Sequence, residues 1–236
     1  MKIVKNDLFD YGLEIYQGEL GFKFSLDSIL LAEFVDSVTK EVTVLDMCTG
    51  NAPVPLILST KILGKIKGFE IQKEVAELAD CSIKLNNLQD RIQIINDDIN
   101  NIDKYFEAGY FDVITCNPPF FKANETSILN ECLEKAIARH EIKVTLESIL
   151  KKASFCLRNK GMLYLVHRPE RLQEILTFCS KYNLFIKKIQ FVFSNIQENA
   201  HIVLIKAVKN GNLGTVISAP MCVNSLKTYK NIFKDV

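Results

Sequence analysis

Hydrophobic and polar positions follow two alternating periods along most of the chain. Short, β-branched apolar runs predict strands at 42–47, 65–71, 91–95 and 111–116. Between them, apolar residues recur at helical spacing over 53–63 and 75–87. Strands that alternate with helices in this way indicate a mostly parallel sheet covered on both faces.

The last third of the chain continues this pattern but ends differently. Helical spacing marks 146–157 and 170–181, with a predicted strand at 162–166 between them. The final two apolar runs, 185–193 and 200–208, are joined by a link too short for a helical crossover. We therefore expect two antiparallel neighbours at one edge of a seven-stranded sheet, in an α/β, Rossmann-like fold.

Composition sets limits on the domain organisation and on the partners. The 236 residues are 48% hydrophobic and contain no repeat, low-complexity tract or linker rich in proline, glycine or serine, which predicts a single domain over 1–236. The 29 basic and 28 acidic residues leave a net charge of +1. Charge therefore neither demands nor excludes a nucleic-acid partner.

Cysteine usage and the apolar runs bear on the compartment. The 7 cysteines are odd in number and form no Cys-x-x-Cys pair, which indicates reduced thiols and argues against a zinc site or a disulfide framework. The first residues lack the apolar segment of a signal peptide, and no apolar run approaches the roughly 18 residues of a membrane span. We expect a cytoplasmic protein with no metal and no membrane contact.

Polar residues stand where the first three predicted strands end, which is where an open α/β sheet binds its ligand. The turn of small residues from Asp46 to Pro53 would let a ligand approach the backbone, or would serve tight packing alone. Glu70 could accept hydrogen bonds from a ribose diol, or be an exposed carboxylate. Asp98 could meet the edge of a bound base, or simply cap the next helix.

The sequence Asn117-Pro118-Pro119-Phe120 after the fourth strand is the sharpest chemical signal. An aromatic amine is a poor nucleophile because its lone pair is delocalised into the ring, so catalysis needs acceptors for its N–H groups. The Asn117 side-chain oxygen and the Pro118 carbonyl can be those acceptors, and the two prolines fix the backbone that aims them. Phe120 offers a face on which a base can stack.

These positions together resemble a family. The chain is similar to class I methyltransferases of the amino-methylating group, and more closely to the bacterial tRNA1(Val) (adenine-37-N6)-methyltransferases. The segments that carry this resemblance are 21–32, 45–51, 69–70, 98–99, 117–120 and 168–172. The resemblance implies a Rossmann-like class I methyltransferase fold, with residues 1–40 as an N-terminal helical extension that closes over the cofactor site.

The family also implies a cofactor, S-adenosyl-L-methionine, and a set of residues that hold it. They are Phe24, Ser25, Asp27, Asp46, Cys48, Thr49, Gly50, Asn51, Glu70, Ile71, Asp98, Ile99 and Asn117. The catalytic corner would be Asn117, Pro118, Pro119 and Phe120. This chain departs from the family where Cys48 and Ala52 replace glycines of the cofactor loop, which puts cofactor affinity in question.

A tRNA substrate requires basic contacts near the target amine. We expect these from Lys122, Arg168 and Arg171. His140 and His167 have no partner arrangement for nucleophilic catalysis and are interpreted as structural or surface residues.

The predicted function is methyl transfer to N6 of an adenine in tRNA, at position 37 of valine tRNA. Two alternatives stay open: methylation of a glutamine in a protein such as a release factor, and a non-catalytic nucleotide- or RNA-binding module. The sequence does not indicate the oligomeric state.

Overall fold

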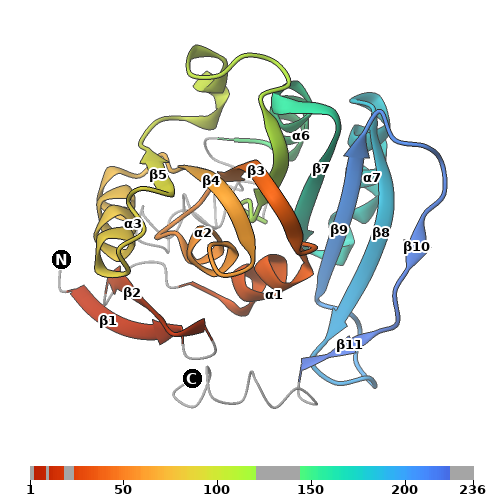
Figure 1. The fold of residues 1–236 in the computed structure, drawn as a ribbon. Coiled ribbons are helices and arrows are strands. Elements are labelled where there is room, and N and C mark those ends of the chain that lie inside the picture. Colours follow the sequence, from red (N-terminus) through yellow and green to blue (C-terminus); the bar gives the residue numbers. More distant parts are fainter. Residues whose placement is uncertain (1–2, 9–10, 19–23, 121–143, 224–236) are drawn as a thin grey trace, which may run out of the picture.

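The computed structural model describes residues 3–8, 11–18, 24–120 and 144–223, which form a small hairpin and one large sheet with helices on both faces (Figure 1). The hairpin consists of β1 (Ile3–Leu8) and β2 (Leu13–Gly18), paired antiparallel. The large sheet has nine strands.

Five strands of the large sheet are parallel neighbours. They are β3 (Val38–Met47), β4 (Ile62–Phe69), β5 (Ile92–Ile95), β6 (Phe111–Cys116) and β7 (Leu157–His167). β3 lies at the centre, between β4 and β6, and β5 lies at one edge. The carboxyl ends of these strands therefore lie along one side of the sheet.

The other end of the sheet contains the antiparallel pair that the short link predicts. β9 (Ile202–Lys209) lies between β7 and β8 (Leu184–Phe193) and runs antiparallel to both. Two further strands, β10 (Val216–Ile217) and β11 (Met221–Cys222), pair with the outer side of β8. The expected seven strands thus become nine, because two-residue strands leave no readable alternation in the sequence.

Helices cover both faces of the large sheet. α1 (Leu26–Phe34), α2 (Pro53–Leu58) and α3 (Lys73–Leu85) contribute to one apolar cluster, and α6 (Leu146–Cys156) and α7 (Leu172–Lys181) contribute to another. Consecutive strand residues alternate between the clusters: Val113 belongs to the first and Ile114 to the second. This alternation explains why apolar residues occupy consecutive positions in the central strands, as at Val113 and Ile114.

The boundaries differ from the predicted ones where local side chains intervene. α2 ends at Leu58, well before residue 63, and β4 starts at Ile62. The hydroxyl of Ser59 donates to the Leu56 carbonyl at 2.7 Å, and that of Thr60 to the Ile57 carbonyl at 2.8 Å. Hydroxyls that bond to nearby backbone in this way compete with helix continuation.

The N-terminal extension was predicted as helical, and for its first part this is wrong. A β-hairpin precedes α1, and Gly12 in its turn has a positive φ of 64°. The hairpin is fixed by α3: the Asn86 amide donates to the Glu14 carbonyl at 2.6 Å, and the Ser82 hydroxyl accepts from the Tyr16 N–H at 2.9 Å. Such distant contacts leave no local signature.

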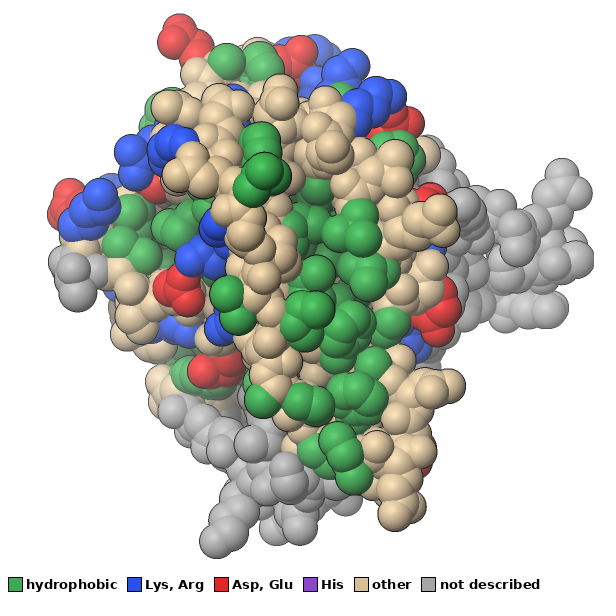
Figure 2. Space-filling view, turned by 90° about the vertical axis from the view of Figure 1, so that its right-hand side faces the viewer, with side chains coloured by type: hydrophobic (Ala, Val, Ile, Leu, Met, Phe, Trp, Pro, Cys, Tyr) green, Lys and Arg blue, Asp and Glu red, His purple; other side chains and the backbone are tan. Residues whose placement is uncertain are grey.

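Apolar side chains gather on the side of the molecule where β8 and β10 form the sheet edge (Figure 2). Val216 and Ile217 of β10 are 62% and 68% exposed. Among the described residues, none from β8 to β11 contributes to the cavity described below. No described helix has the length and hydropathy required to span a membrane.

Candidate active site

A cavity of about 440 Å³ opens at the carboxyl ends of the central strands, a size suited to a small-molecule ligand. Every residue predicted to hold the cofactor lines it, and so does the whole Asn117–Phe120 corner. The loops after β3, β4, β5 and β6 therefore converge on one space, as the topology of an open α/β sheet requires. The start of α1 forms a further wall through Phe24, Ser25 and Asp27.

The loop after β3 keeps the backbone shape of a glycine loop although two of its residues are not glycine. Cys48, Gly50 and Ala52 all have positive φ, at 58°, 58° and 70°. Left-handed backbone is strained for residues with a Cβ, and such strain concentrates at binding sites. Two of the three left-handed positions of this loop are therefore occupied by residues that carry a Cβ.

Hydrogen bonds with residues outside the loop hold it in place. Asn51 is 4% exposed and its side-chain amide donates to the Tyr16 carbonyl of β2 at 2.9 Å. Glu70, 7% exposed at the end of β4, accepts the Gly50 N–H at 2.9 Å and the Gln72 N–H at 2.9 Å. Burial raises the pKa of Glu70, which these backbone hydrogen bonds partly oppose. Each of its oxygens retains lone pairs that a ribose diol could use.

Asp46 is the most deeply buried acid of the site, at 1% exposed. It accepts the Thr49 hydroxyl at 2.6 Å and the Thr115 hydroxyl at 2.6 Å. Burial raises its pKa to about 7, and the nearby Glu70 adds to the rise. The pocket thus contains two carboxyl groups whose ionised forms are poorly solvated, a setting that favours a cationic ligand.

In the loop after β5, the predicted capping role of Asp98 is confirmed, and the same residue also lines the cavity. Asp98 caps the short 3₁₀ helix η2 (Ile99–Lys104), because its side chain accepts the Asn100 N–H at 2.9 Å. It also lines the cavity beside Ile99, which is 5% exposed. A residue at a helix N-terminus can thus fix the loop and still face a ligand.

The Asn117–Phe120 corner faces the same cavity. Asn117 donates its side-chain N–H to the Ser28 hydroxyl of α1 at 3.0 Å, which leaves the side-chain oxygen as an acceptor. Pro118 and Pro119 are buried and have no N–H groups. The corner therefore offers the Asn117 side-chain oxygen and the proline carbonyls as acceptors, and its two prolines have no N–H donors. A bound amine needs such acceptors for its N–H groups.

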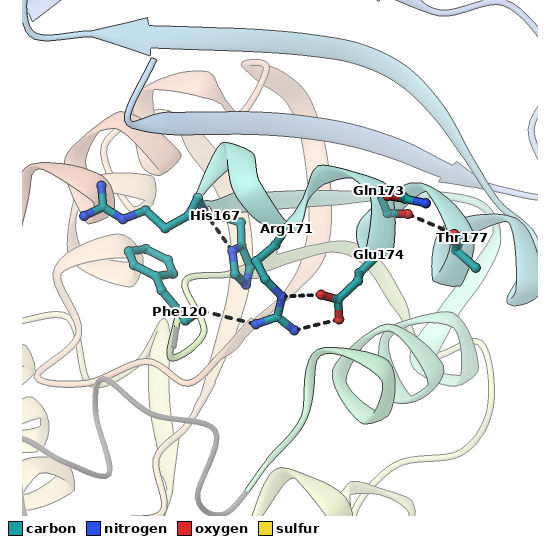
Figure 3. A network of polar contacts seen from close by, with 7 residues as sticks. Phe120, His167, Arg171, Gln173, Glu174 and Thr177 are labelled. Carbon is teal, nitrogen blue, oxygen red and sulfur yellow. Dashed lines mark hydrogen bonds and ion pairs between the residues drawn. The ribbon is translucent and has the colours of Figure 1, made fainter. Parts of the chain in front are cut away.

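Phe120 lies beside His167, the last residue of β7 (Figure 3). Its ring centroid is 5.2 Å from that of His167, at an interplanar angle of 48°. The guanidinium carbon of Arg168 lies 5.8 Å from the Phe120 ring centroid, and one of its N–H groups donates to the His201 carbonyl at 2.7 Å. This arrangement orients the ring beside the cavity.

The three predicted RNA contacts have different surroundings. Arg168 lines the cavity, next to the proposed target site. Arg171 does not line it: its guanidinium donates to the Phe120 carbonyl at 3.2 Å and forms an ion pair with Glu174 (Figure 3). Lys122 and His140 lie outside the described residues. His167 is fully buried, in agreement with a structural role.

Several lining residues were not among the predicted cofactor-binding, catalytic or RNA-binding residues. They are Ser28, Pro53, Val54, Phe69, Gln72, Val75, Asp97 and Val144. Ser28 is the informative one, because it contacts the catalytic corner directly. Its signal was a small polar residue within the apolar helix 26–34, where a hydroxyl at 4% exposure needs a partner.

Comparison with known proteins agrees with this geometry. The family described as "Methyltransferase small domain" matches residues 24–192, which is more than half of the chain. The chain belongs to this family. The matched segment of this methyltransferase domain runs from the start of α1 into β8 and includes the loop after β3 and the Asn117–Phe120 corner.

Two proteins with assigned names are similar to this methyltransferase domain in sequence. A Porphyromonas gingivalis protein named tRNA1(Val) (adenine(37)-N6)-methyltransferase is 30% identical over 61% of this chain and 57% of its own length. A Cytophaga hutchinsonii protein of the same name is 25% identical over 77% of this chain and 74% of its own length. The first match thus spans little more than half of that relative.

A solved structure extends the comparison to three dimensions. The predicted O-methyltransferase from Agrobacterium tumefaciens is 19% identical, with a TM-score of 0.65 over 84% of this chain and 88% of that chain. At this identity, the likeness establishes the class I methyltransferase fold.

Proposed function

We propose that this protein transfers a methyl group from S-adenosyl-L-methionine to the exocyclic N6 of an adenine in tRNA, at position 37 of valine tRNA. The observation that carries the proposal is that the Asn117–Phe120 corner and the Gly50–Glu70 pair line one cavity. A methyl donor and a flat amine could therefore meet there. The names of the relatives from Porphyromonas and Cytophaga support the same acceptor.

The residues of the cavity fit the proposed cofactor. The cofactor would supply a methyl group on a positively charged sulfur. Glu70 would accept hydrogen bonds from its ribose, and Asp98 and Ile99 would contact its adenine. The left-handed loop from Cys48 to Ala52 would lie against its methionine end, close to the buried carboxyl of Asp46. Two poorly solvated carboxyl groups favour a cationic ligand in such a pocket.

The corner would act on the acceptor. The Asn117 side-chain oxygen and the Pro118 carbonyl accept the two N–H groups of the amine, which favours a nitrogen lone pair directed at the methyl group. Phe120 supports the ring of the base. No group of the protein needs to remove a proton before attack, so orientation and proximity supply the rate enhancement. A tRNA acceptor places the reaction in the cytoplasm.

The N-terminal segment 1–40 has a place in this proposal. Phe24, Ser25 and Asp27 precede or begin α1 and line the cavity, and Ser28 contacts Asn117. We infer that this segment closes the cofactor site and aligns it with the corner, as one unit with the rest of the chain.

The experiment is incubation with labelled S-adenosyl-L-methionine and separate pools of tRNA, rRNA, DNA and protein. Digestion of the product and mass identification of the nucleoside would follow. We expect label in tRNA as N6-methyladenosine. Label only in DNA or protein would refute the acceptor, and a protein product carrying methylglutamine would favour the amide alternative. Calorimetry that detects no cofactor binding at millimolar concentration would favour a non-catalytic module.

A further inference from the structure

Arg171 is a largely enclosed cation whose guanidinium contacts the end of the Asn117–Phe120 corner. Its side chain is 11% exposed, and its guanidinium makes a two-point contact with the Glu174 carboxylate, at 3.0 Å from Nε and 3.1 Å from Nη2. The remaining terminal nitrogen donates to the Phe120 carbonyl at 3.2 Å. Figure 3 shows the guanidinium between the end of the corner and α7.

The corner needs such a contact because of its own sequence. β6 ends at Cys116, and neither Pro118 nor Pro119 has an N–H to donate to a neighbouring strand. Asn117 is anchored at one end of the corner through Ser28. At the other end, the Phe120 carbonyl is anchored by the planar, three-way fork of Arg171, which a lysine could not reproduce.

The Arg171 guanidinium also influences the residue that packs against the Phe120 ring. His167 packs against the Phe120 ring and accepts the Arg168 N–H with Nδ1 at 2.8 Å. Burial is the main cause that lowers the pKa of His167 to about 3, and the nearby Arg171 guanidinium lowers it further. The imidazole is therefore neutral. Arg171 therefore lies near a neutral imidazole, and the Glu174 carboxylate balances its charge.

We propose that Arg171, oriented by Glu174, is a positioning residue for the methyl acceptor: it fixes the Phe120 carbonyl and thereby the ring on which the target base stacks. This inference rests on the proposed methyltransferase function. It replaces the phosphate contact that the sequence suggested for Arg171, because a guanidinium committed to a carboxylate and a carbonyl is ill placed to neutralise RNA.

The test is steady-state kinetics of tRNA methylation by wild type, Glu174→Gln, Arg171→Lys and Arg171→Gln. Glu170→Gln is the matched control, since Glu170 is exposed and carries the same charge change four residues earlier. Thermal melting and calorimetric cofactor affinity are measured for every variant. Salt titrations of KM for tRNA report phosphate contacts.

Glu174→Gln distinguishes a positioning role of Arg171 from a phosphate contact, because the Glu174 carboxylate itself cannot bind phosphate. Positioning predicts that kcat falls about tenfold or more in Glu174→Gln and in Arg171→Lys, with cofactor Kd unchanged, because small misplacement of a reacting group is costly. The Glu170→Gln control retains the wild-type kcat. The slope of log KM against log salt stays that of the wild type in Arg171→Gln.

The proposal is overturned if Glu174→Gln keeps its kcat, or if Arg171→Lys is near normal while Arg171→Gln lowers the salt slope by about 0.7, the value of one phosphate contact. Glu174→Gln alone decides the matter if the Arg171 variants fail to fold. A wild-type protein that methylates no tRNA would instead contradict the proposed function, and the same variants would then be measured on whichever acceptor takes the label.

Discussion

Replacement of Asp46 by asparagine should stabilise the protein at neutral and alkaline pH. The side chain is 1% exposed, and burial raises its pKa from the ordinary 3.8 to about 7. At about 1.36 kcal/mol for each pH unit, this rise corresponds to about 4 kcal/mol of unfavourable free energy once the carboxyl is ionised. Asparagine has the same shape and no charge to desolvate.

The pH dependence has a definite sign. The folded protein holds the Asp46 proton up to about pH 7, whereas the unfolded chain releases it near 3.8. Because the folded state binds more protons in this interval, the free energy of unfolding contributed by Asp46 falls as pH rises, and the full cost applies above pH 7. The stability gained by Asp46→Asn should therefore be small near pH 4 and largest at pH 8.

The two threonine hydroxyls reduce the expected gain. Thr49 and Thr115 both donate to the carboxylate, and an asparagine accepts with only one of its two polar atoms. Loss of one such bond costs about 1–2 kcal/mol, which leaves a net gain of about 2 kcal/mol. For a chain of this length that is roughly 4–8 °C in Tm.

Thermal melts of the cofactor-free protein at pH 5, 6, 7 and 8 measure this effect. The control is Asp103→Asn, because an ion pair with Lys152 lowers the pKa of that exposed carboxyl and its removal should not stabilise at high pH. A Tm difference that stays constant or shrinks with pH would refute the reasoning. The gain should be accompanied by weaker cofactor binding, since the charge that costs stability favours a cationic ligand.

The other substitutions address the cofactor and the acceptor separately. Glu70→Gln should weaken S-adenosyl-L-methionine binding by roughly 10- to 100-fold in calorimetry, because charge-assisted hydrogen bonds are worth about 1.5–3 kcal/mol; an unchanged Kd would exclude the ribose contact. Asn117→Ala should lower kcat by about 10²- to 10³-fold with little change in cofactor Kd, and a near-normal rate would discredit the amine-acceptor mechanism. Ser28→Ala should lower kcat by about tenfold, because the asparagine carboxamide loses its anchor. Ser59→Ala, which removes a buried hydroxyl bonded within its own helix, is the control and should keep the wild-type rate.

The central sheet and its loops could be predicted because their causes are local. Phe111–Cys116 is mostly apolar, and two prolines follow shortly after it, so the bounds of β6 were predicted correctly. The rule that ligands bind at the carboxyl ends of parallel strands then places the loops after β3, β4, β5 and β6 at one site. The predicted cofactor residues of these loops line the cavity for this reason, whereas Phe24, Ser25 and Asp27 reach it from the start of α1.

What the sequence did not reveal depends on contacts between distant segments. Ser28 and Asn117 are 89 residues apart and meet only when α1 packs over the end of β6. Arg171 was predicted as an RNA contact, and its hydrogen bond to the Phe120 carbonyl joins residues that are 51 positions apart. The hairpin β1–β2 has partly exposed strands and is held by side chains of α3.

The β1–β2 hairpin connects the N-terminal residues to the segment that matches the family model. The Tyr16 carbonyl receives the Asn51 amide at 2.9 Å, yet the family match begins only at residue 24. The loop after β3 therefore donates a hydrogen bond to a carbonyl that lies outside the segment matched by the family model. In a shortened chain that starts at the family boundary, the Asn51 amide would lose the Tyr16 carbonyl and would have to donate to water. The first eighteen residues therefore belong in any version of the protein used for binding studies.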